Sequence, residues 1–290
     1  MNFFRYMERI RKRFIVFLML ISSHGLLAQK NDSATTLILV GTRHDGNSKL
    51  SYKHLHRLFK SLKPDIIFIE QNSSLFPPCQ FKPVFGAQIA SFLGIWKVSI
   101  ERKAVQKYYR RNKKTCIVAY DTTFARNQYL KNYVNNDSRI DAILEKLFRE
   151  GKMSASDSIE YKYHEDISNE FYSQLEESLV SMNRPDMIKI IASLDSAHRA
   201  IFQKLVQKYI SDQELKEWSA TNLAFWDQRN EFMAVQLLEH IALNPGKKMI
   251  VLSGLLHKYP LLQLLTKAKK NLQLSFRIVD NLEQFANSGL

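Results

Sequence analysis

The sequence predicts an α/β fold with a mainly parallel central sheet flanked by helices. Five short apolar runs have the length and composition of buried strands, at 36–41, 64–70, 115–121, 248–253 and 274–279. Helical patterns separate these runs near both ends of the chain, and such alternation is typical of a parallel sheet. The stretch from about 122 to 245 is almost wholly helical in pattern. We therefore expect a helical insertion or cap between the third and fourth strands.

The connecting helices are predicted from their apolar spacing. One covers about 50–62 and ends at Lys63-Pro64, another follows the fourth strand at about 258–270, and the apolar segment 84–98 is a short helix. The run 101–114 is a helix rich in Lys and Arg, and a solvated face is its default interpretation. Contact with an anionic membrane or glycan is the alternative. No nucleic-acid-binding motif accompanies the run, so nucleic acid is not an expected partner.

The composition is that of a globular protein. The 290 residues are 45% hydrophobic and 24% charged, and the formal net charge of +14 favours anionic partners or surfaces. The sequence contains no Walker loop, GxGxxG turn, GxSxG elbow or HExxH helix. The usual nucleotide-binding, serine-hydrolase and zincin signatures are thereby excluded.

Residues 1–28 have the layout of a secretory signal peptide. Basic residues up to Arg13 precede an apolar run at 14–21, and small residues continue to Ala28, after which we place the cleavage. The run is short for a membrane span, and an uncleaved anchor is the alternative. Residues 29–290 are then one exported domain, periplasmic or secreted. Because exported compartments permit disulfides, Cys79 and Cys116 are equally compatible with a bridge and with two free thiols.

Three predicted strands deliver side chains that can bind a metal ion or move a proton. Gly41-Thr-Arg-His44 follows the first strand, Gly254-Leu-Leu-His257 follows the fourth, and Glu70 ends the second. Ligands bind outside the carboxyl ends of parallel strands. We therefore expect the two imidazoles and the carboxylate to form one site, with polar atoms within about 8 Å of one another. The glycines are expected to permit tight turns at the strand ends.

Each of these residues also has a structural interpretation. His44 could be an ordinary loop residue, and His257 could occupy the first turn of a helix and meet solvent. A buried carboxylate must be paired or hydrogen-bonded, so Glu70 could form a salt bridge with Arg43 or a nearby lysine.

Two further residues and three aromatic side chains belong to the prediction. Asp121 ends the third strand and either joins the site or caps the following helix. Arg229, in a helical run, could clamp a substrate anion or a site carboxylate, or lie on a solvated face. We expect Trp218, Phe225 and Trp226 to be substantially buried where the helical cap meets the α/β core.

The motifs around these residues resemble the TraB/GumN–Tiki family, within the wider superfamily of erythromycin esterases and ChaN haem-iron proteins. The resemblance rests on residues 37–44 with Ser48, on 63–70, on 228–230 and on 251–257, and leaves most of the helical middle uncovered. It implies an α/β fold with a helical insertion and with His44, Glu70 and His257 in one cleft; Asp121 and Arg229 match more loosely. The family often has acids beside that arginine, where this chain has Gln228 and Asn230.

The resemblance implies an exported hydrolase of peptides or small esters, because Tiki members are described as divalent-metal-dependent proteases and erythromycin esterases are hydrolases. His44, Glu70 and His257 would give manganese, cobalt or zinc three ligands and leave a position for water. Without a metal, one histidine would be the general base and Glu70 its orienting partner. The alternatives are a non-catalytic haem- or iron-binding protein of ChaN type and an interaction protein with a vestigial site.

Overall fold

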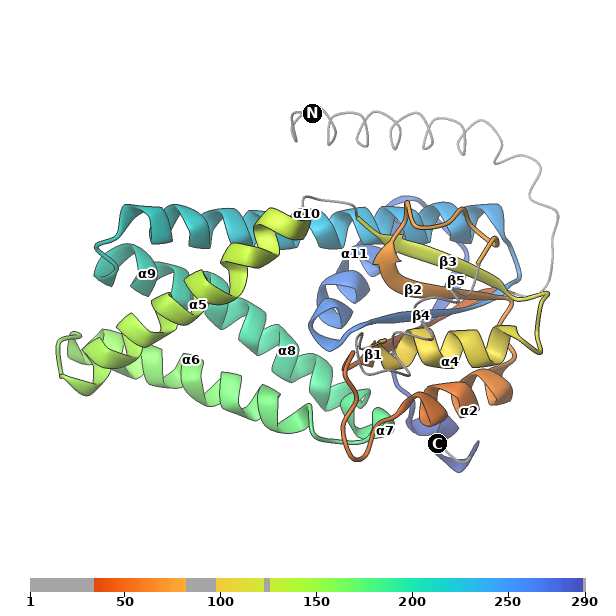
Figure 1. Cartoon of the computed structure of the whole chain (residues 1–290), viewed down its shortest axis with the longest axis horizontal. Coiled ribbons are helices and arrows are strands. Elements are labelled where there is room, and N and C mark those ends of the chain that lie inside the picture. Colours follow the sequence, from red (N-terminus) through yellow and green to blue (C-terminus); the bar gives the residue numbers. More distant parts are fainter. Residues whose placement is uncertain (1–33, 82–97, 123–125, 289–290) are drawn as a thin grey trace.

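The computed structural model describes residues 34–81, 98–122 and 126–288 and contains a five-stranded, wholly parallel sheet flanked by helices (Figure 1). The predicted fold class is confirmed. Strand order across the sheet is β3-β2-β4-β1-β5, so the fourth strand lies between the first two. The strands are β1 (Thr35–Thr42), β2 (Ile66–Asn72), β3 (Cys116–Asp121), β4 (Lys248–Gly254) and β5 (Phe276–Val279).

The helices agree with the predicted alternation. They are α2 (Tyr52–Leu62), α4 (Ile100–Tyr109), α5 (Arg126–Arg149), α6 (Ala155–Gln174), α7 (Leu179–Met182), α8 (Pro185–Ala197), a π-helical turn η1 (His198–Phe202), α9 (Gln203–Tyr209), α10 (Gln213–Leu243), the short 3-10 turns η2 (Leu255–His257) and η3 (Glu283–Ser288), and α11 (Lys258–Asn271). The signal peptide predicted at 1–28 and nearly all of the helix predicted at 84–98 lie outside the described residues. None of the helices within those ranges is long and apolar enough to cross a membrane.

Both faces of the sheet are covered. Successive strand side chains point to opposite faces, so Ile38 and Ile250 pack toward α2 and α4, while Leu37 and Met249 pack toward α10 and α11. These side chains are almost completely buried. Burial of each contributes about 1.5–3 kcal/mol, which fixes the strand register.

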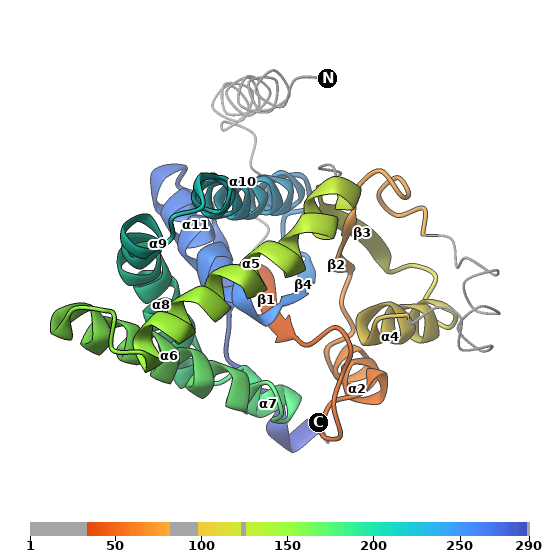
Figure 2. The same cartoon turned by 60° about the vertical axis from the view of Figure 1, so that its left-hand side comes forward.

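The helical insertion lies between β3 and β4, as predicted, and extends to one side of the sheet (Figures 1 and 2). We call α5 to α9 with the first half of α10 the helical block. It has a core of its own, which includes Leu144, Leu205 and Leu215. Helix α10 continues for 31 residues, about 46 Å, and its second half packs Leu237 on the sheet. One long helix therefore joins the block to the α/β core.

The three aromatic residues expected at this junction are only partly buried. Trp218 packs against the core of the helical block and donates a hydrogen bond to Asp137 at 3.1 Å. Its place is therefore inside the block and not at the junction. Trp226 lies farther along α10, beside the candidate site described below.

A buried asparagine ties the helical block to the end of β1. Asn183, which follows α7, accepts from the backbone N–H of Gly41 at 2.8 Å and donates to the carbonyl oxygen of Gly41 at 2.9 Å. The buried ammonium of Lys258 donates to the same amide oxygen at 2.8 Å. The side chain of Asn183 thus occupies the place that a neighbouring strand would take, and it fixes the strand end that leads to His44.

The structure settles the state of the two cysteines and shortens one predicted helix. Cys79 and Cys116 form a disulfide, which decides between the two alternatives left open by the sequence. Helix α4 ends at Tyr109, whereas the basic helix was predicted to continue to 114. The chain must turn there to start β3 at Cys116, and Thr115 donates to the carbonyl oxygen of Pro64 in that turn.

Candidate active site

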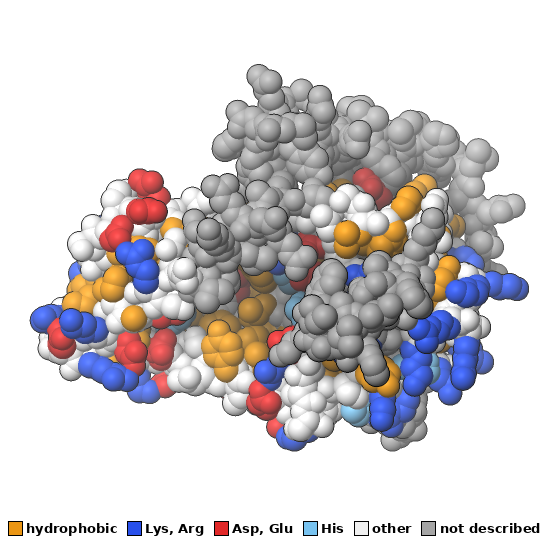
Figure 3. Space-filling model, in the orientation of Figure 1, with side chains coloured by type: hydrophobic (Ala, Val, Ile, Leu, Met, Phe, Trp, Pro, Cys, Tyr) orange, Lys and Arg blue, Asp and Glu red, His pale blue; other side chains and the backbone are white. Residues whose placement is uncertain are grey.

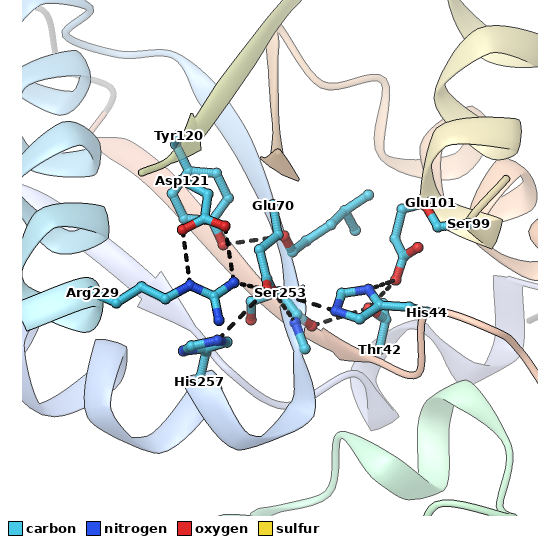
Figure 4. Close-up of polar contacts among 12 residues, drawn as sticks. Thr42, His44, Glu70, Ser99, Glu101, Tyr120, Asp121, Arg229, Ser253 and His257 are labelled. Atoms are coloured by element: carbon cyan, nitrogen blue, oxygen red, sulfur yellow. Dashed lines mark hydrogen bonds and ion pairs between the residues drawn. The ribbon is translucent and has the colours of Figure 1, made fainter. Parts of the chain in front are cut away.

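The carboxyl ends of β1, β2 and β4 bring His44, Glu70 and His257 together (Figure 4). The Nε2 atom of His44 lies 3.7 Å from Oε1 of Glu70, and the Nε2 atom of His257 lies 3.6 Å from the same oxygen. The predicted convergence is confirmed. It follows from strand order, because β4 lies between β1 and β2 and places the second Gly-x-x-His motif between the first and Glu70.

The glycines of the two motifs let the motifs approach each other. A Cβ on Gly41 would collide with the side chain of Leu255 and lie 3.3 Å from its Cα. A Cβ on Gly254 would lie 3.2 Å from Nε2 of His44 and 3.4 Å from Oε2 of Glu70. Neither glycine has a positive φ. The reason for glycine is therefore close approach between the motifs, since neither position needs a backbone conformation that only glycine adopts.

Glu70 is the centre of the cluster. Its Oε1 accepts a hydrogen bond from Nη2 of Arg229 at 2.6 Å, and its Oε2 accepts from the backbone N–H of Gly254 at 2.5 Å. Only 8% of its side chain is exposed. The alternative pairing with Arg43 is wrong, because Arg43 instead pairs with Glu176 of the helical block.

Arg229 joins Asp121 to the site. Its Nε and Nη2 donate to the two oxygens of Asp121 at 3.0 and 2.9 Å, in the bidentate geometry that guanidinium favours. Asp121 also accepts from the backbone N–H of Thr122 at 2.8 Å. Among the alternatives predicted for Arg229, the structure shows the contact with site carboxylates. All five predicted site residues therefore lie in one connected cluster.

His257 is held in one tautomer by Asn230. The Nδ2 atom of Asn230 donates to the carbonyl oxygen of Trp226 at 2.8 Å, which turns its Oδ1 toward Nδ1 of His257 at 2.7 Å. Since an amide oxygen can only accept, Nδ1 of His257 carries the proton and Nε2 presents a lone pair to the site. The imidazole is 3% exposed and stacks on Trp226 with ring centroids 4.1 Å apart. The solvent-facing alternative for His257 is wrong.

His44 is oriented by a residue that sequence reasoning missed. Glu101, in the first turn of α4, accepts from Nδ1 of His44 at 3.0 Å and also contacts the hydroxyl of Thr42. The Nε2 atom of His44 consequently faces Glu70. One signal could have identified Glu101, because it is the single acid in an otherwise basic helical run.

The pKa values of the two histidines are shifted in opposite directions. Partial burial disfavours charge on His44, but hydrogen bonds with Glu101 and Glu70 outweigh it and raise its pKa to about 10. Because 48% of the side chain is exposed, water screens part of this effect. Burial lowers the pKa of His257 to about 4, so it is neutral at pH 7. Burial also disfavours charge on Glu70, yet His257, His44 and Arg229 hold the pKa of this carboxyl below its usual range.

The donor types suit a divalent metal ion. Metal-binding histidines usually donate their second ring N–H to a carboxylate or carbonyl oxygen, as His44 does to Glu101 and His257 does to Asn230. Across the described ranges, however, no group of three or more His, Cys, Asp and Glu side chains is arranged as a formed metal site. Oε1 of Glu70 accepts from Arg229, so an ion bound to that oxygen would have to displace the guanidinium contact.

We compared the chain with known proteins in three ways. No protein-family model matches it, no curated protein matches it, and no solved structure matches it.

Proposed function

We propose that this chain is an exported hydrolase of the TraB/GumN–Tiki type, which cleaves peptide or ester bonds with water activated at His44, Glu70 and His257. One observation carries the proposal. Both imidazoles have their Nδ1 atoms held by oxygen acceptors and turn their Nε2 atoms toward one oxygen of Glu70, at 3.7 and 3.6 Å. The Nε2 lone pair of neutral His257 repels that oxygen, so a cation between them is favoured. The raised pKa of His44 places a proton on its Nε2 at neutral pH, and a metal ion bound there would displace that proton.

We propose further that a divalent ion, manganese, cobalt or zinc, occupies that position during turnover. His44, Glu70 and His257 would hold it, and Glu101 and Asn230 would keep the imidazoles oriented. A bound divalent ion lowers the pKa of coordinated water and supplies a nucleophile near neutral pH.

The remaining residues have roles that follow from their contacts. In the metal-free form of the proposal, the Nε2 atom of neutral His257 would instead act as the proton acceptor, and Trp226 covers one face of its ring. Arg229 holds Glu70 and Asp121 in place and adds positive charge beside the reacting position. A positive charge there favours the anionic transition state of acyl transfer.

The direct test is alanine substitution of either histidine, assayed on a panel of fluorogenic peptides and p-nitrophenyl esters. If the proposal holds, His44→Ala and His257→Ala each lower turnover by a factor of about 100 to 10,000. His56→Ala is the matched control, because His56 lies on α2 outside the site. Thermal unfolding of each variant separates lost chemistry from lost structure.

A chelator distinguishes the two forms of the proposal. Activity that disappears with chelator and returns with a divalent ion supports the metal-dependent reaction, and Glu70→Gln should then abolish the return. Activity that resists the chelator supports histidine as a metal-free general base. A wild-type rate in either histidine variant would refute the hydrolase proposal and leave the ChaN-type binding protein as the hypothesis to pursue.

A further inference from the structure

The edge of the sheet at which the strands begin is strongly basic. Lys63 precedes β2, Lys113 and Lys114 precede β3, and Lys269 and Lys270 end α11 before β5. Because all five strands are parallel, these lysines lie at one edge, opposite the candidate active site. We call these five residues the basic edge. All are exposed, and within the described ranges none forms an ion pair.

Acidic residues do little to neutralise this edge. Asp65 lies at this edge, where its carboxylate pairs with Lys247 at 3.3 Å and accepts from the backbone N–H of Lys248 at 2.9 Å. Glu70, Glu101 and Asp121 belong to the active-site edge. The basic edge therefore keeps a local excess of positive charge.

The basic surface continues along the outside of α2 and α4, where Figure 3 shows Lys and Arg side chains gathered at one end of the molecule. Cations from the two helices face each other there. Burial and the positive charges of Lys107, Lys60 and Arg111 together lower the pKa of His56, which lies between them. Exposed cations of this surface include Lys53, Lys60, Lys103, Lys107 and Arg111.

Apolar groups lie at the same edge. Leu243, the last residue of α10, is 71% exposed and precedes the short connection that leads into β4 at Lys248. An open groove of about 850 Å³ beside β5 is lined by Ala34, Leu274 and Phe276 together with Lys269 and Lys270. Ala34 is also the point at which the N-terminal segment, with its apolar run at 14–21, enters β1.

We propose that this edge docks on the surface of an anionic lipid bilayer, with Leu243 in the headgroup region and the basic edge against lipid phosphates. Exposed apolar groups beside clustered cations are the combination that interfacial membrane binding uses. A nucleic acid or an acidic glycan would attract the lysines but would gain nothing from Leu243. The active site, at the opposite edge, then faces away from the bilayer and is open to substrates in solution.

Charge reversal at the edge tests the lysines. Lys113→Glu/Lys114→Glu is compared with the wild-type full chain by cosedimentation with phosphatidylcholine vesicles, with or without phosphatidylglycerol. Each lysine near an anionic surface strengthens binding about fivefold, so we expect the double variant to lose roughly 30-fold or more on anionic vesicles. The matched control is Lys146→Glu/Lys162→Glu, on exposed positions of the helical block. Equal losses in the two variants would overturn the proposal.

A second variant tests the bilayer itself. Leu243→Ser should weaken binding to anionic vesicles about fivefold, because half-burial of a leucine is lost, and should leave binding to heparin unchanged. Ile159→Ser is the matched control, since Ile159 is 72% exposed on α6 of the helical block. If Leu243→Ser binds vesicles as the wild type does, while the lysine variant loses heparin, the surface recognises a soluble polyanion and the membrane proposal fails.

Discussion

The two glycines of the Gly-x-x-His motifs should respond in opposite ways to replacement by alanine. A Cβ on Gly254 would lie 3.2 Å from Nε2 of His44, 3.4 Å from Oε2 of Glu70 and 3.7 Å from Cδ2 of His257. It would stand among the three proposed site residues, where water or an ion is needed. A Cβ on Gly41 would instead meet the buried side chain of Leu255.

The expected magnitudes follow from those neighbours. Gly254 has φ −53° and ψ 141°, which alanine adopts freely, and His44 is exposed enough to shift by a few tenths of an ångström. The stability change should be within about 1 kcal/mol, since reduced freedom of the unfolded chain offsets the contact. Turnover should fall at least about 100-fold. Gly41→Ala overpacks a closed site and should cost about 1–3 kcal/mol of stability, with kcat/KM per folded molecule preserved.

The two quantities are measured separately. Urea unfolding gives the stability change, and kcat/KM on a responsive peptide or ester gives the chemistry. Calorimetric titration with zinc or cobalt provides a readout that needs no substrate, and Gly254→Ala should weaken it while Gly41→Ala should not. Full activity and full metal affinity in Gly254→Ala would refute the idea that the reacting position lies against this glycine.

Three further predictions follow from the site and the core. The pKa of His44 is raised to about 10, so protonated His44 stabilises the fold fully below pH 6.5, and this stabilisation is lost as pH rises toward 10. Urea unfolding of the wild type should therefore show stability falling between these pH values, and His44→Gln should show a smaller fall. Glu101→Gln removes the negative charge beside Nδ1 of His44, and NMR titration should detect a lower pKa of His44 with the fold intact. The Cys79–Cys116 bridge closes 37 residues, so Cys79→Ser/Cys116→Ser should lower the unfolding free energy by about 4 kcal/mol, measured against the wild type with and without reductant.

The strands, and the site residues at their carboxyl ends, were predictable from the sequence. Apolar runs of strand length located all five strands, and the carboxyl ends of parallel strands located His44, Glu70 and His257. This succeeds because a buried strand leaves a nearly continuous apolar signal, and because parallel pairing places the ends of neighbouring strands together.

Features that depend on how helices pack could not be predicted in the same way. Glu101 enters the site from a helix whose charge pattern resembles a solvated surface, and only the packing of α4 beside β1 and β2 turns it toward His44. Trp226 is a large aromatic residue of the kind that usually packs in a core. Helix α10, on which it lies, passes both the core and the site, and the Trp226 ring stacks on His257. Asn183 likewise gives no local sign that it would pair with Gly41, which is 142 residues away.

The order of strands has a consequence for the order of folding during synthesis. In the described structure β1 pairs with β4 and β5, and both of these are encoded after residue 247. β2 can pair early with β3, but the strand that joins this pair to β1 is β4. A nascent chain that ends before β4 therefore leaves its first strand without a sheet partner. Such distant pairing closes long loops and is slow, so the finished sheet forms only after nearly the whole chain has been made.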